Sequence, residues 1–103
     1  MSRDSDSDSG SAAPTLASLR ASLDVLDHTL VDLLAERRTR VRELFALKRR
    51  EGLPLYDPVR EAALIADRLE RGAEHDVPPE LVLAVFRAIL QASRDEAGAP
   101  TAP

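Results

Sequence analysis

The segment from Leu16 to Arg50 constrains the fold more than any other part of the chain, because its pattern predicts one helix that no Gly or Pro interrupts. A helix of about 35 residues is about 52 Å long, whereas a compact domain of about 80 residues is only about 25–30 Å across. The helix therefore extends beyond its own domain, and we expect something else to cover its far half.

One face of this segment is a row of leucines with the 3-4 spacing of a buried helix face. Thr15 is the expected N-cap, although Ser18 is not expected to complete a capping box. Gly52 and Pro54 end the helix. Two such helices laid antiparallel cover each other, so the segment predicts an obligate homodimer. The row consists of Leu16, Leu19, Leu23, Leu26, Leu30 and Leu33.

Two cations interrupt the apolar face. The position seven residues after Leu30 is Arg37, and Lys48 follows the apolar Phe45. An unpaired cation on a buried face costs several kcal/mol, so the pattern predicts either an anionic ligand or a carboxylate on a neighbouring helix. The cations are eleven residues apart. That is nearly three turns, so they share a face at a separation of about 16 Å and can hold a small dianion between them. The other arginines between positions 38 and 50 are expected to form a solvated basic face.

Two shorter helices are expected to follow. Asp57 as N-cap and Pro58 at the first helical position begin one of them, which should stop at Arg71–Gly72. The next begins near Pro79 and ends near Gly98. No strand pattern is present. The predicted fold class is all-α, with one very long and two shorter helices in an intertwined homodimer.

The composition excludes several kinds of partner and site. We expect disordered tails over residues 1–14 and 98–103 and a helical domain over residues 15–97. A net charge of −4 offers no electrostatic basis for binding nucleic acid. The chain has no Cys, and His28 and His75 lack partners at metal-ligand spacing, so no metal site is expected. No signal peptide or membrane-spanning run is visible, which predicts a cytoplasmic protein without membrane contact.

Arg20 lies beside the leucine row near the start of the long helix. It is 28 residues from Lys48, or about 42 Å along the axis, so the two side chains cannot reach one small ligand within one chain. In an antiparallel dimer, Arg20 of one chain approaches Arg37 and Lys48 of the other. The long helix therefore predicts a site shared between subunits.

The order and spacing of these polar residues resemble those of the all-helical chorismate mutases. The resemblance covers about residues 16–97 without a gap. Each piece alone is a common helix sequence, but the combination in this order is specific. The matching pieces are Leu16-x-x-Leu19-Arg20, Asp27, Leu33-Leu34-Ala35-Glu36-Arg37-Arg38, Lys48 and Asp57-x-x-Arg60-Glu61.

The resemblance implies the conversion of chorismate to prephenate, a Claisen rearrangement, in the biosynthesis of Phe and Tyr or of aromatic secondary metabolites. It implies an intertwined homodimer with two sites, no cofactor, and a small-molecule dicarboxylate as substrate. Arg20 from the partner chain and Arg37 would bind the two carboxylates, and Lys48 would contact a carboxylate and the ether oxygen.

The same resemblance assigns roles to the two shorter helices. Asp57 and Glu61 would hold the ring hydroxyl, Arg60 would line the pocket, and Ser93 would help to fix the ring carboxylate. The catalytic set is then Lys48, Arg37 and Glu61.

One position departs from the family pattern. Family members usually have Gln, sometimes Glu, four residues after the Ser93 position, where it donates to the ether oxygen, and this chain has Ala97. Glu96 points about 100° away on a regular helix and needs a proton to donate. The alternatives are a slow mutase, the same fold acting as a 4-amino-4-deoxychorismate mutase or isochorismate pyruvate lyase, a site completed by an activating partner protein, or a non-catalytic helical dimer.

Overall fold

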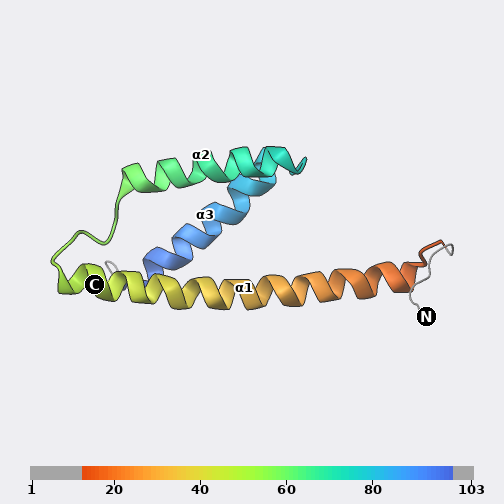
Figure 1. The fold of residues 1–103 in the computed structure, drawn as a ribbon, viewed down its shortest axis with the longest axis horizontal. Helices are drawn as coiled ribbons and strands as arrows, with labels where there is room; N and C mark the ends of the chain where they lie inside the picture. Colours follow the sequence, from red (N-terminus) through yellow and green to blue (C-terminus); the bar gives the residue numbers. More distant parts are fainter. Residues whose placement is uncertain (1–12, 99–103) are drawn as a thin grey trace, which may run out of the picture. The chain divides into compact units, whose positions relative to one another are not determined.

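A computed structural model describes residues 13–98 and contains three helices in the order α1 (Leu16–Arg50), α2 (Pro58–Glu74) and α3 (Pro79–Glu96) (Figure 1). The described range contains no strand, which confirms the predicted all-α class with one long and two shorter helices. Residues 1–12 and 99–103, which hold nearly all of both predicted tails, lie outside the described range. None of the described helices is long and apolar enough to cross a membrane.

The first turn of α1 is closed by a capping box. The Thr15 hydroxyl accepts from the backbone N–H of Ser18 at 3.0 Å, and the Ser18 hydroxyl accepts from the backbone N–H of Thr15 at 2.9 Å. The expectation that Ser18 would not complete the box was therefore wrong, because a Ser hydroxyl reaches back to the cap as the longer Glu or Gln side chain does. Beyond the other end of α1, Gly52 adopts a φ of +69°, as expected for a helix-terminating glycine.

Helix α2 begins as predicted and ends later than predicted. Asp57 caps it by accepting from the backbone N–H of Arg60 at 3.0 Å. The helix runs through Gly72 to Glu74, because this glycine serves packing and not termination. A Cβ at Gly72 would lie only 2.7 Å from Cγ2 of Val82, so its absence allows α2 to approach α3 closely.

The chain divides into two compact units, the first ending at Glu36 and the second beginning at Arg37. In the second unit α2 packs against α3, and α3 returns from the end of α2 towards the last turns of α1 (Figure 1). Its core is small and consists of Phe45, Leu64, Val82, Leu90 and Ala97.

The first unit presents an apolar surface. Every leucine of the row from Leu16 to Leu33 is 51–66% exposed. The described part of the first unit therefore leaves an apolar helix face uncovered, which is more than isolated surface leucines would give.

Candidate functional site

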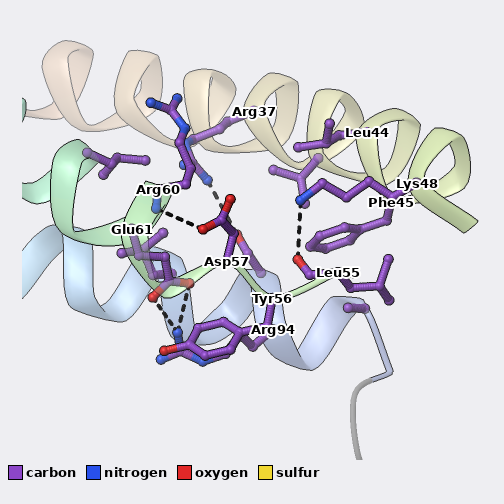
Figure 2. Close-up of a pocket in the computed structure, with 15 residues that line it drawn as sticks. Arg37, Leu44, Phe45, Lys48, Leu55, Tyr56, Asp57, Arg60, Glu61 and Arg94 are labelled. Carbon is purple, nitrogen blue, oxygen red and sulfur yellow. Dashed lines mark hydrogen bonds and ion pairs between the residues drawn. The ribbon is translucent and has the colours of Figure 1, made fainter. Parts of the chain in front are cut away.

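A pocket in the second unit is lined by the last turns of α1, the segment that connects α1 to α2, the first turns of α2, and the end of α3 (Figure 2). Its floor is apolar and includes Phe45, Leu64 and Leu90. The structure brings six of the seven predicted site residues to this one pocket. They are Arg37, Lys48, Asp57, Arg60, Glu61 and Ser93.

Arg37 enters the pocket as a half-buried cation. Its Nη1 donates a long hydrogen bond of 3.4 Å to the hydroxyl of Ser93, and it forms no ion pair with any residue between 13 and 98. Burial, and next the positive charge of Arg68, lower the pKa of Arg37 because both disfavour its charged form. An anionic ligand offsets both effects. The alternative of a carboxylate partner on a neighbouring helix is not seen in the described part of the chain.

Lys48 is the second half-buried cation of α1. Its Nζ donates to the backbone carbonyl oxygen of Leu55 at 3.3 Å, which places the ammonium against the connecting segment (Figure 2). Lys48 also has no ion pair within residues 13–98. An ammonium has three donors, so the single described hydrogen bond leaves donors for a ligand oxygen.

Ser93 links the two sides of the pocket. Its hydroxyl donates to the backbone carbonyl of Ile89 at 3.0 Å and accepts from Arg37 at 3.4 Å. The side chain of a small helix residue thus positions the guanidinium of a different helix.

Glu61 is already paired in this structure. Nη1 of Arg94 donates to its two carboxylate oxygens at 2.7 and 2.9 Å (Figure 2). Sequence reasoning missed Arg94 as a pocket residue. The signal was present, because Arg94 follows Leu90 by four residues and so interrupts the apolar face of α3, as Arg37 interrupts that of α1.

The end of α3 is held by arginines of α1. Glu96 accepts from Nε of Arg38 at 2.7 Å and from Nε of Arg42 at 2.6 Å, and Nη2 of Arg49 donates to the carbonyl of Ala97 at 2.6 Å. These arginines are exposed, as expected of a solvated basic face, but three of them also bind the end of α3, which the sequence did not indicate.

Ala97 lines the pocket and is 8% exposed, so its methyl group occupies a position that faces the ligand space but cannot donate. Glu96 does not supply the donor that Ala97 lacks. The hydrogen bonds from Arg42 and then Arg38 lower the pKa of Glu96, which keeps its carboxylate ionised and without a proton to donate.

The two ion pairs of Glu96 carry a testable pH dependence. Because its pKa is lowered on folding, they stabilise the folded chain above the ordinary value of 4.5 and lose this effect as the pH falls through the lower folded pKa. We expect Glu96→Gln to melt below the wild type at about pH 7, with a smaller difference at about pH 3.

The matched control for this experiment is Glu43→Gln, since Glu43 is 62% exposed and its ion pair within residues 13–98 is with Arg40 of its own helix at 3.2 Å. It should barely change the melting temperature at either pH. An equal effect of both substitutions would show that the pairs of Glu96 have no special role.

Arg20 lies in the first unit and is not among the residues that line the pocket. It is exposed. The shared site that the sequence predicts therefore stays a prediction. Within residues 13–98 there is also no cluster of three or more His, Asp or Glu side chains that could hold a metal ion.

A comparison with family models shows the family of the chain. The family model described as chorismate mutase type II matches residues 19–97. The chain is 41% identical over 78 residues to a T-protein of Enterobacter agglomerans, covering 76% of this chain and 21% of the relative. It is 30% identical over 77 residues to a chorismate mutase of Methanocaldococcus jannaschii, covering 74% of this chain and 77% of the relative.

A T-protein of Haemophilus influenzae is 32% identical over 78 residues, again covering 76% of this chain and 21% of the relative. The chain thus spans about a fifth of the length of the two T-proteins and about three quarters of the archaeal protein. No solved structure matches the chain significantly.

Proposed function

The chain belongs to the chorismate mutase type II family, and from this premise we propose that it catalyses the rearrangement of chorismate to prephenate in aromatic amino acid biosynthesis. The observation that carries the proposal is the pair of half-buried cations on α1. Arg37 and Lys48 line one apolar-floored pocket, and neither is paired with a carboxylate within residues 13–98. A site of this kind suits a small molecule with two carboxylates.

The reaction does not require a chemically reactive side chain. Within one molecule the ether C–O bond breaks while a C–C bond forms, so no nucleophile, proton transfer or cofactor takes part. The enzyme has to hold the flexible substrate in a chair-like conformer and to stabilise the negative charge that develops on the ether oxygen. Fixed cations and hydrogen-bond donors in a pocket with apolar walls supply both functions.

Each α1 cation suits one of these tasks. The planar guanidinium of Arg37 can bind a carboxylate through two parallel hydrogen bonds, and its contact with Ser93 sets its direction. Lys48 is a compact charge whose remaining donors can meet the ether oxygen. An interaction that strengthens as this oxygen becomes negative favours the transition state over the ground state and so raises kcat.

The proposed assembly is an antiparallel homodimer in which the first part of α1 contributes to the partner's site. The exposed leucine row of the first unit supports it, because a partner helix of the same pattern would cover that row. Arg20 lies beside the row and would enter the partner's pocket as a third cation for the substrate carboxylates. The proposed cellular location is the cytoplasm.

Ala97→Gln should raise kcat for chorismate by at least about 10-fold, because it adds a donor where the ether oxygen is expected and one such donor contributes about 10²–10³ in rate. Steady-state kinetics by absorbance would measure it. Ala97→Leu is the matched control, since it adds volume without a donor and should not raise kcat. A kcat for the Gln variant equal to that of the wild type would show that the ether oxygen lies elsewhere.

The first test of the function is to incubate the purified protein with chorismate and to identify the product by NMR. Prephenate is the expected product. The absence of any conversion, also with 4-amino-4-deoxychorismate and isochorismate, would contradict the proposal for the chain alone. The assay would then be repeated with candidate partner proteins, since the family occurs as a part of longer chains such as the T-proteins.

A further inference from the structure

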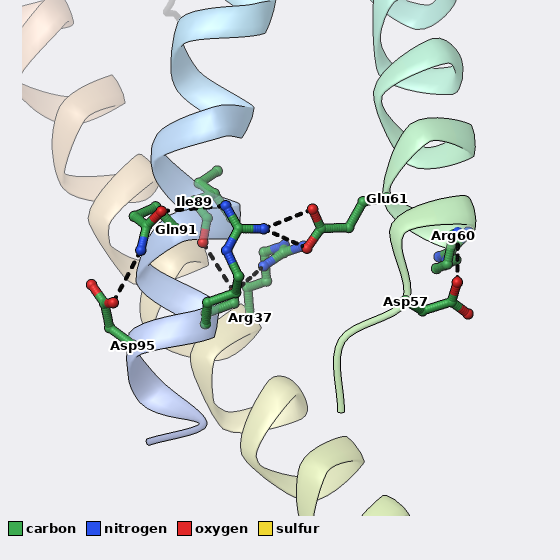
Figure 3. A network of polar contacts seen from close by, with 9 residues as sticks. Arg37, Asp57, Arg60, Glu61, Ile89, Gln91 and Asp95 are labelled. Atoms are coloured by element: carbon green, nitrogen blue, oxygen red, sulfur yellow. Dashed lines mark hydrogen bonds and ion pairs between the residues drawn. The ribbon is translucent and has the colours of Figure 1, made fainter. Parts of the chain in front are cut away.

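Arg94 supplies the pocket with a cation that the proposed roles do not use. Its Nη1 donates to both carboxylate oxygens of Glu61, and its Nη2 donates to Oε1 of Gln91 at 3.3 Å. Nε2 of Gln91 in turn donates to Asp95 at 3.1 Å. The guanidinium carbon of Arg94 lies 5.5 Å from the centre of the Tyr56 ring. Glu61 of α2, Gln91 of α3 and Tyr56 of the connecting segment therefore contact the guanidinium. Figure 3 labels Glu61, Gln91 and Asp95 of this network.

The pair of Arg94 and Glu61 forms a wall of the pocket. Both residues, together with Tyr56 and Leu90, line the pocket on one side and a second hollow between α2 and α3 on the other. The two charged side chains are 36% and 24% exposed, so the pair is partly shielded from water. A ligand in the pocket therefore meets the carboxylate and the guanidinium together.

The charges of the lining residues indicate what this wall does. Four cations and two carboxylates line the pocket, which leaves a net charge of +2 and matches a dianionic ligand. Without Arg94 the net charge falls to +1 and the carboxylate of Glu61 faces the dianion without compensation. The cations are Arg37, Lys48, Arg60 and Arg94, and the carboxylates are Asp57 and Glu61.

A paired carboxylate selects its ligand differently from a free one. Two carboxylate oxygens offer about four acceptor positions, so Glu61 can still accept from a hydroxyl group while Arg94 occupies one position on each oxygen. A free carboxylate attracts an ammonium group more strongly than a neutral hydroxyl. With a guanidinium at hydrogen-bond distance this attraction is cancelled, and the guanidinium itself repels a second cation.

We propose that Arg94 determines which ring substituent the pocket accepts: by cancelling the charge of Glu61, it selects substrates with a neutral hydroxyl over those with a cationic ammonium. The inference rests on the proposed function, since it places the ring substituent of a chorismate-like dianion against Glu61. It makes Arg94 a specificity-determining residue in a position that the family resemblance left without a role.

The test compares kcat/KM for chorismate with that for 4-amino-4-deoxychorismate, in which an amine that is protonated at neutral pH replaces the ring hydroxyl. The wild type should prefer chorismate. Arg94→Met, which keeps the length of the side chain but not its charge, should shift the ratio towards the amino substrate by about 10-fold or more. Arg94→Lys should restore most of the preference, and Arg94→Gln repeats the charge removal in case the Met variant does not fold.

Arg87→Met is the matched control, because Arg87 also lies on α3 and lines the second hollow but not the pocket. It should leave the ratio unchanged. A purely structural role for Arg94 would lower both kcat/KM values in parallel and leave their ratio unchanged, which would overturn the inference. A wild type that prefers the amino substrate would overturn it too.

The test of the proposed function is independent of the test of Arg94, because it depends only on whether the wild type forms prephenate. If the wild type converts neither substrate, titration calorimetry decides the inference. The probes are an oxabicyclic dicarboxylate that carries the ring hydroxyl and its amino counterpart. The wild type should bind the hydroxyl compound more tightly and Arg94→Met should lose this preference, whereas equal ratios for both proteins would refute the role of Arg94.

Discussion

Arg37→Ala is expected to lower kcat/KM for chorismate by about 10³-fold while the helices and the oligomeric state stay as in the wild type. The substitution removes a half-buried cation whose place nothing else on the described part of α1 can take, since Lys48 lies three turns further along. The substrate carboxylate would lose a bidentate partner, and the pocket would lose half of its net positive charge.

The fold should tolerate this change because Arg37 contributes little to stability. Its described hydrogen bond to Ser93 is long, at 3.4 Å, and burial disfavours its charge. Circular dichroism and gel filtration would be measured beside the kinetics. If Arg37→Ala instead dissociated or unfolded the protein, the cation would have a structural role, as the non-catalytic alternative requires.

The matched control is Arg40→Ala. Arg40 lies about one turn away on the same helix and is 67% exposed, and its ion pair in the described part of the chain is with Glu43. The variant loses the same charge from the same element, so it should keep kcat/KM within about 2-fold. A loss comparable with that of Arg37→Ala would mean that general electrostatic attraction, and not the pocket, governs the reaction.

Mixing two inactive variants should restore activity if the site is shared between subunits. Arg20→Ala removes the cation proposed to act in the partner's pocket, and Lys48→Ala removes one that acts in its own. Each variant alone should lose at least about 10²-fold in kcat/KM. In a mixed dimer one of the two sites combines an intact Arg20 with an intact Lys48, so re-equilibrated equal mixtures should regain about a quarter of the wild-type activity.

The double variant Arg20→Ala/Lys48→Ala, mixed with the wild type in the same way, is the control for this experiment. Each mixed dimer then has two damaged sites, so activity should fall below that of the wild type diluted to the same concentration. Mass spectrometry would show whether the chains of the two single variants have exchanged. If they have exchanged and no activity returns, Arg20 and Lys48 do not form one site across two subunits: they act within one chain or in different sites.

The helices themselves followed from local signals. The uninterrupted apolar period and the caps at Thr15 and Asp57 predicted where α1 and α2 begin, and both starts are confirmed. The end of α2 was placed too early, at Gly72. A glycine lacks a Cβ, and this one property allows it either to end a helix or to let another helix pack closely. Only the approach of Val82 to Gly72 decides which of the two applies.

Residues of the candidate site could be predicted from the sequence where a charged side chain interrupts the apolar face of a helix. That rule identified Arg37 and Lys48, and the order of the polar residues indicated Asp57, Glu61 and Ser93, all of which line one pocket. Applied to α3, the same rule would have found Arg94. The shared position of Arg20 follows from helix length alone and stays a prediction.

The sequence by itself determined where the helices begin, the family, and six residues that line the pocket, because period, caps and the spacing of charges act within a few turns of one helix. The partners of the charges were decided only by the tertiary structure. Arg94 pairs with Glu61 across 33 residues, and Arg38 and Arg42 hold Glu96 across 58 and 54 residues. Such pairs depend on how the helices pack in space. No local pattern distinguishes an arginine that pairs with a carboxylate, such as Arg94, from one that has no such partner within residues 13–98, such as Arg37.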